Sequence, residues 1–125
     1  MVVFSYTHLI DNNQWDLFDR FDKVDIIGLT TYPWKHFDKP EEISVDYFSK
    51  LNQYITKPVA FTEIGWVGDE IEQAEFLVRF LELTADINME MVNWLFLHEI
   101  EIVGIGKSIF SPESATISLK KQMEL

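Results

Sequence analysis

The residues best suited to chemistry are one carboxylate and a set of aromatic and histidine side chains at the ends of apolar segments. Glu63 ends the predicted strand that begins with the apolar run Val59–Phe61, one residue beyond Thr62, and this run suits a strand buried on both faces of a parallel sheet. Gly65 lets the chain turn just beyond it. An acid at the carboxyl end of such a strand is where α/β barrels hold their catalytic groups. The alternative is a solvated loop acid, the usual state of a glutamate.

Aromatic and histidine residues recur where the other predicted strands end. They are Tyr6 and His8, Tyr32 and Trp34, Trp66 beyond Glu63, and Trp94 and His98. Parallel strands would gather them at one rim, where rings stack on the C–H faces of a sugar and a tyrosine hydroxyl orients a carboxylate. The sequence therefore predicts an oligo- or polysaccharide as partner. The alternative for each aromatic ring is ordinary core packing, and for each histidine a hydrogen-bonded or exposed imidazole.

No metal or cofactor is predicted. His8 and His98 lack an i, i+4 partner and a nearby cluster of ligands, which a zinc site needs. No strand is followed by a glycine-rich phosphate loop, so a nucleotide-binding α/β domain of the flavodoxin type is a less favoured alternative.

Four strands and four helices are predicted to position these residues. Strands are expected at about residues 2–7, 25–30, 59–63 and 91–97, and helices at about 14–21, 44–55, 70–85 and 112–123. The segment 99–110 has two glycines and little periodicity, so it is predicted as a loop. Alternating strands and helices imply right-handed crossovers and a parallel sheet, in one α/β domain over residues 1–125.

Composition narrows the partners further. The chain of 125 residues has 21 acidic against 10 basic residues and a net charge of −11, which disfavours nucleic acid and anionic membranes because phosphates would be repelled. There is no cysteine, so disulfides and thiolate chemistry are excluded. No apolar run approaches the length of a membrane span. The compartment is left open.

Three segments together resemble the clan A glycoside hydrolases. They are Val24–Trp34, Lys57–Trp66 with the pattern PV-x-x-TE-x-GW, and Val92–Trp94. The chain is most similar to the branch that contains the arabinogalactan endo-β-1,4-galactanases, which are retaining (β/α)8 enzymes. The resemblance implies that Glu63 is the catalytic nucleophile and that Tyr32 donates a hydrogen bond to it. It also implies that Trp94 faces the sugar.

The chain departs from this family in one large respect. The family's acid/base is a glutamate after an asparagine, and no Asn-Glu pair occurs here. The resemblance covers strands five to eight, and a whole barrel takes about 250 residues. We therefore expect half of a TIM barrel, completed by dimerisation, by a complementing polypeptide or by a missing N-terminal half. Retaining hydrolysis needs two carboxyl groups, so a lone copy is expected to be inactive.

Two functions follow from this expectation. The first is the C-terminal half of a retaining β-glycan hydrolase, in which Glu99 or the neighbouring His98 of a second copy would take the acid/base position. The second is a non-catalytic barrel fragment that folds as a homodimer or binds carbohydrate.

Overall fold

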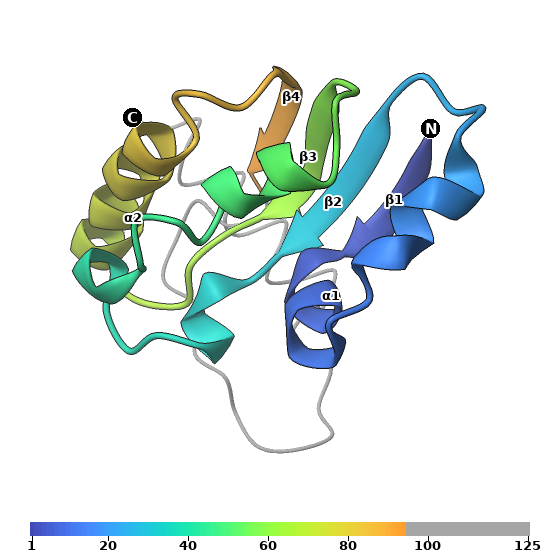
Figure 1. Cartoon of the computed structure of the whole chain (residues 1–125). Coiled ribbons are helices and arrows are strands. Elements are labelled where there is room, and N and C mark those ends of the chain that lie inside the picture. The colour runs from blue at the N-terminus through green and yellow to red at the C-terminus, as the bar shows by residue number, and fades with distance from the viewer. Residues whose placement is uncertain (95–125) are drawn as a thin grey trace, which may run out of the picture.

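A four-stranded parallel sheet forms the centre of the fold (Figure 1). The computed structural model describes residues 1–94. The strands are β1 (Val2–Ser5), β2 (Ile27–Thr31), β3 (Val59–Ile64) and β4 (Met89–Trp94), and every neighbouring pair is parallel. The predicted α/β character and parallel sheet are confirmed. The last residues of the predicted fourth strand, 95–97, lie outside the described residues.

The strands lie in the sheet in the order of the sequence, β1-β2-β3-β4. Parallel connections are right-handed, so an order that never reverses carries every connection over the same face. Figure 1 shows the helical segments on one side of the sheet, toward the viewer. A doubly wound sheet differs, because its strand order reverses at a switch point and helices cover both faces. The described sheet is therefore singly wound.

The longest helix is α2 (Glu70–Leu83), and here the prediction is confirmed to within two residues. Asp69 caps it: its side chain accepts a hydrogen bond from the Glu72 backbone N–H at 2.9 Å, and the Glu72 carboxylate accepts one from the Asp69 N–H at 3.0 Å. This reciprocal pair satisfies two N–H groups that a helix start leaves free. Phe76 and Phe80 are fully buried on its inner side.

The other helical predictions were wrong in part. Helix α1 (Tyr6–Asn12) starts inside the predicted first strand, because the Ser5 side chain caps it and Asn13 ends it in the left-handed region at φ 51°. The predicted helix at 14–21 is a 3-10 helix, η1 (Trp15–Phe21). Of the predicted helix at 44–55, only the 3-10 segment η4 (Ser49–Gln53) forms.

Composition explains why the predicted helix at residues 44–55 does not form in full. Residues 44–55 contain serine, aspartate, asparagine and β-branched residues, which are weak helix formers. Two further 3-10 turns, η2 (Pro33–Lys35) and η3 (Pro40–Glu42), begin at prolines, whose fixed φ suits the first position of a helical turn. The predicted loop at 99–110 and helix at 112–123 lie outside the described residues.

An aromatic core fills the space between the sheet and the helical segments. The Phe48 ring meets those of Phe61 on β3 and Phe80 on α2 edge-on, at 5.7 and 5.3 Å between centroids. Phe61 and Phe80 are 5.1 Å apart. Edge-to-face rings at these distances are attractive beyond the area that they bury. These contacts pack α2 and the segment that contains Phe48 against the helix-covered face of the sheet.

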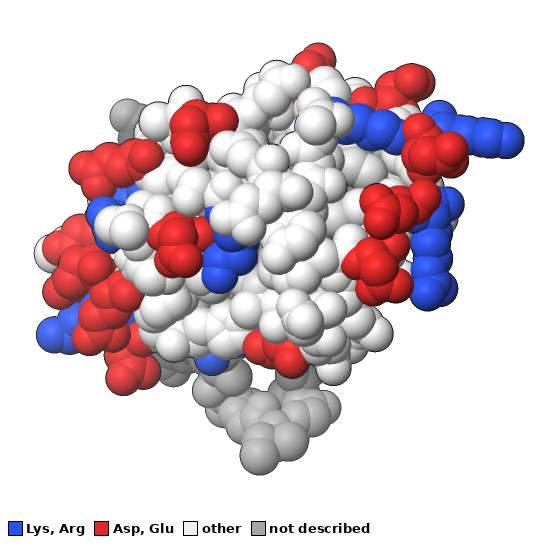
Figure 2. All heavy atoms as spheres, in the orientation of Figure 1, with Lys and Arg blue, Asp and Glu red and all other residues white. Residues whose placement is uncertain are grey.

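Charged side chains are unevenly placed on that side of the molecule. Figure 2 shows acidic residues gathered on the left, over α2, and acidic and basic residues side by side on the right, over η1, with fewer charges in the band between them. No helix in the part of the chain that the structure describes has the length and apolar character needed to cross a bilayer.

Candidate functional site

The face of the sheet opposite the helical segments, here called the far face, carries the candidate site. Phe4 and Phe61 define the covered face, because their rings contact Phe18 of η1 at 5.2 Å and Phe80 of α2 at 5.1 Å. Alternate strand residues point to opposite faces. Strand alternation and register assign these residues to the far face: Val3, Ser5, Gly28, Thr30, Ala60, Met91 and Asn93.

Direct contacts support this assignment. A Cβ added to Gly28 would lie 2.8 Å from Val3 Cγ2 and 3.3 Å from Met1 Sδ. The side chain of Val3 therefore lies across the β2 backbone on the same face as the missing Gly28 side chain. Glycine at this position leaves room for its neighbour on β1.

A β-bulge aims Glu63 at the far face. Leu29 of β2 is opposite Phe61 and Thr30 is opposite Glu63, so Thr62 is an extra residue on β3. Phe61 and Ile64 are both fully buried in the core, with two residues between them instead of the usual one. Both intervening residues, Thr62 and Glu63, are half-buried. Bulges of this kind redirect side chains and are frequent beside active sites.

Polar groups of the neighbouring strands flank Glu63 at the carboxyl edge of the sheet. Thr30 is opposite it on β2. On β4, Asn93 donates a hydrogen bond from Nδ2 to the Thr62 carbonyl at 3.2 Å. Within residues 1–94 no hydrogen bond joins Tyr32 to Glu63, so the described structure does not form the contact that the resemblance implies.

Tyr32, Trp34 and Lys35 form a small aromatic and cationic group after β2. The two rings are 6.3 Å apart, edge to face, and Lys35 Nζ lies 5.4 Å from the Tyr32 centroid and 5.8 Å from that of Trp34. The Trp34 indole Nε1 is buried and has no hydrogen-bond partner among the described residues. Tyr32 and Trp34 keep partly exposed surface at the predicted rim.

The structure places three predicted sugar-binding residues elsewhere. Trp66 is fully buried, and its ring lies 5.2 Å from Phe76. The Trp94 ring also lies near that of Phe76, at 5.4 Å, so Trp94 belongs to the helix-covered face. For Trp66 core packing, the alternative considered above, is the better description. The β4 residue next to Glu63 on the far face is Asn93.

Tyr6 is also a core residue. Its side chain is fully buried, stacks on Phe48 at 5.7 Å and donates its hydroxyl to the Tyr47 carbonyl. Burial raises the pKa of Tyr6 strongly, because a phenolate would be desolvated there. The chain turns into α1 at this residue, and this turn takes the side chain away from the predicted rim. Tyr6 has no exposed face to offer a sugar.

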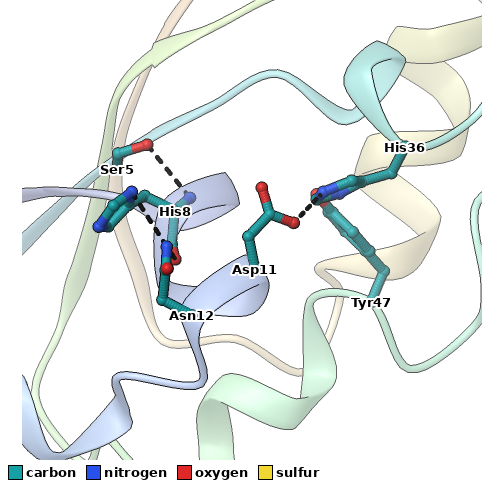
Figure 3. Close-up of polar contacts among 6 residues, drawn as sticks. All are labelled: Ser5, His8, Asp11, Asn12, His36 and Tyr47. Atoms are coloured by element: carbon teal, nitrogen blue, oxygen red, sulfur yellow. Dashed lines mark hydrogen bonds and ion pairs between the residues drawn. The ribbon is translucent and has the colours of Figure 1, made fainter.

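His8 is exposed on α1. Its ring Nδ1 lies 3.2 Å from Asn12 Nδ2, one helical turn on, as Figure 3 shows. His8 therefore matches the alternative considered for it in the sequence, an exposed imidazole that takes part in a hydrogen bond. His98 and Glu99 lie outside the described residues.

A polar network that sequence analysis missed lies under the loop after β2. His36 bridges two partners in Figure 3: its Nε2 is 2.7 Å from Asp11 Oδ1, and its Nδ1 is 3.0 Å from the Tyr47 hydroxyl. The three residues join α1, the loop and the start of η4. They are up to 36 positions apart in sequence, so no local pattern signals their contact.

Tyr47 is the buried end of this network. Burial raises the pKa of Tyr47 to about 12, and the hydroxyls of Thr31 and Thr7 act in the opposite direction. Both threonine side chains are themselves buried. The network fastens the loop that carries Tyr32 and Trp34 to the core.

Two further observations concern metal binding and cavities. Within residues 1–94 no group of three or more potential ligands is placed to hold a metal ion. A hollow of about 280 Å³ lined by Asn52, Lys57, Asp86 and their neighbours lies at the amino end of β3, the opposite end of that strand from Glu63.

Comparison with known protein families, curated proteins and solved structures finds no match for this chain.

Proposed function

We propose that this chain is the C-terminal half of a retaining β-glycan hydrolase of the (β/α)8 type, with Glu63 as its nucleophile. One observation carries the proposal. A bulge aims Glu63 at the far face, at the carboxyl edge of a singly wound parallel sheet. In α/β barrels this edge holds the catalytic groups, and the face without helices is the interior.

The half-barrel part of the proposal is supported by topology. A (β/α)8 barrel consists of parallel strands in sequence order with every helix outside, and the four described strands have this arrangement. The far face also suits a filled interior, because Gly28 and Ala60 on the central strands leave room for side chains from opposite walls.

The chemistry follows from a single carboxylate. Ionised Glu63 attacks the anomeric carbon, the glycosidic C–O bond breaks, and a glycosyl ester forms. The departing oxygen of a natural glycan needs a proton, and the far-face positions assigned above from strand register include no carboxyl group besides Glu63. A good leaving group such as dinitrophenolate departs without protonation. Such substrates isolate the contribution of Glu63.

A kinetic test uses the full chain and dinitrophenyl β-glycosides of galactose and glucose. We expect slow release of dinitrophenolate, reduced by about 100-fold or more in Glu63→Gln. Glu90→Gln is the matched control, because Glu90 is an exposed acid on the neighbouring strand β4, and it should leave the rate unchanged. Equal rates for all three proteins, or no release above the spontaneous reaction, would contradict the proposal.

The second candidate is a fragment that binds carbohydrate without cleaving it. The observation in its favour is the group formed by Tyr32, Trp34 and Lys35, which presents two partly exposed rings and a cation on one short segment. Binding of a β-glycan that persists in Glu63→Gln but is lost in Trp34→Ala, without turnover in either, would favour this candidate.

A further inference from the structure

The two edges of the described sheet are complementary to each other. β1 pairs only with β2, and β4 only with β3, among the strands of residues 1–94. A two-fold axis parallel to the strands would set β1 of a second copy beside β4, and β4 of that copy beside β1. Both new pairs are parallel, as all the existing ones are. Eight parallel strands close a barrel, and closure removes every open edge.

The side chains of the edge strands fit this contact. Val3 on β1 is 47% exposed, and Met91 and Val92 on β4 are 47% and 37% exposed. Glu90 is the single charged residue in the two edge strands, in a chain of which 25% is charged. Open apolar edges invite pairing unless charge protects them. Two copies of this acidic chain would repel each other less at the sheet edges, which carry one charged residue, than at the charged surfaces over α2 and η1.

We propose that a second copy of this chain completes the barrel and that its Glu63 supplies the acid that this copy lacks. The inference rests on the proposed function. The two-fold axis runs along the barrel, so it places the two Glu63 residues at the same height on opposite walls. Eight strands about 4.8 Å apart and tilted by about 36° enclose a ring roughly 15 Å across. Two inward carboxyl groups therefore reach one glycosidic bond held between them.

The bound glycan is asymmetric, and it gives the two equivalent carboxyl groups different tasks. Retaining hydrolysis of a glycan held between them requires one Glu63 in the ionised form and the other in the protonated form. The ionised Glu63 attacks the anomeric carbon while the protonated one gives its proton to the leaving oxygen. The second carboxylate then takes a proton from water as that water attacks the same carbon. The ester bond breaks, and both groups return to their first state.

This assignment differs from a site completed by Glu99 of the second copy. It uses a residue whose strand, register and direction the structure describes. It also explains how a chain without the family's Asn-Glu pair obtains an acid from a residue that it already has.

The test is site-directed cross-linking, which the absence of native cysteine makes clean. Purified Glu63→Cys is treated at low concentration with a short rigid bismaleimide, and we expect a covalent dimer in denaturing electrophoresis. Thr30→Cys, on the far face of β2, is a second reporter if the first variant folds poorly. Glu82→Cys is the control, because Glu82 is 61% exposed on α2 on the outside. It should remain monomeric under the same treatment.

Mixed dimers test the chemistry. Differently tagged wild-type and Glu63→Gln chains are co-expressed and purified as a pair. The mixed dimer should cleave dinitrophenyl β-glycosides at about half the wild-type rate or more and should lose cleavage of the unactivated glycan. Retained cleavage of the unactivated glycan would overturn the assignment of the acid.

The outcomes separate the two proposals. Failure of both cysteine reporters to cross-link, with Glu63-dependent aryl glycoside cleavage intact, overturns the second copy and leaves the proposed function standing. A closing strand from a different polypeptide would then be the explanation. Cross-linking without any glycoside cleavage overturns the proposed function, and the acid role falls with it.

Discussion

The two faces of the sheet differ in how far residues 1–94 cover them. On the helix-covered face, Phe48, Phe61 and Phe80 meet edge to face and are fully buried. On the far face, small residues at the centre stand between exposed apolar side chains on β1 and β4. The first face gains its stability from contacts within residues 1–94. On our proposal the second is one wall of a barrel whose opposite wall is a second copy, and it holds Glu63.

The largest expected difference between the faces is in stability. Phe61→Ala should lower the free energy of unfolding by about 3–5 kcal/mol, because it leaves a cavity beside the rings of Phe48 and Phe80. Met91→Ala on the far face should cost less than about 1 kcal/mol in dilute protein, because much of that side chain is already in water. Chemical denaturation measures both. Equal losses would break the comparison.

A moderate effect is expected where the far face is tightest. Gly28→Ala should cost about 1–3 kcal/mol, because its new methyl group meets Val3 Cγ2 at 2.8 Å and the Val2 carbonyl oxygen at 3.1 Å. Val3→Ala removes the first of these contacts. In a double-mutant cycle the Gly28→Ala cost should shrink when Val3→Ala is present. A cost that does not depend on Val3 would place these residues on different faces.

A small effect at neutral pH is expected in the network below the loop. Tyr47→Phe removes the hydroxyl that contacts His36 Nδ1 at 3.0 Å and should cost about 1 kcal/mol. The pKa of Tyr47 is raised from 10 to about 12. Its neutral form therefore stabilises the fold fully below pH 10, and this contribution is lost as pH rises toward 12. Tyr47→Phe should flatten that decline in alkaline denaturation, and an unchanged decline would contradict the assignment.

The sequence predicted the elements whose signals are local. The stripe of Phe76 and Phe80 and the acids near Asp69 marked α2, and apolar runs ending in Tyr32 and Glu63 marked two strands. The register could not be predicted, because the bulge at Thr62 depends on how Phe61 and Ile64 pack. This bulge, not strand alternation alone, determines where Glu63 points.

The rim residues were predicted less well because strand ends do not fix side-chain direction. Tyr6 and Trp66 follow apolar runs like Tyr32, but the chain turns at Tyr6 into α1, and Trp66 packs under Phe76. The contact of Asp11 with His36 joins residues 25 positions apart. Such contacts are set by tertiary packing, which no periodicity encodes.

The most direct test of the central claim is covalent trapping of Glu63. A dinitrophenyl 2-deoxy-2-fluoro-β-glycoside needs no acid to release its leaving group, and the fluorine slows hydrolysis of the resulting ester. Mass spectrometry of the digested chain should find one fluoroglycosyl group on the peptide that contains Glu63, and none on Glu63→Gln. An unlabelled wild-type chain, or a label on another residue, would contradict the account.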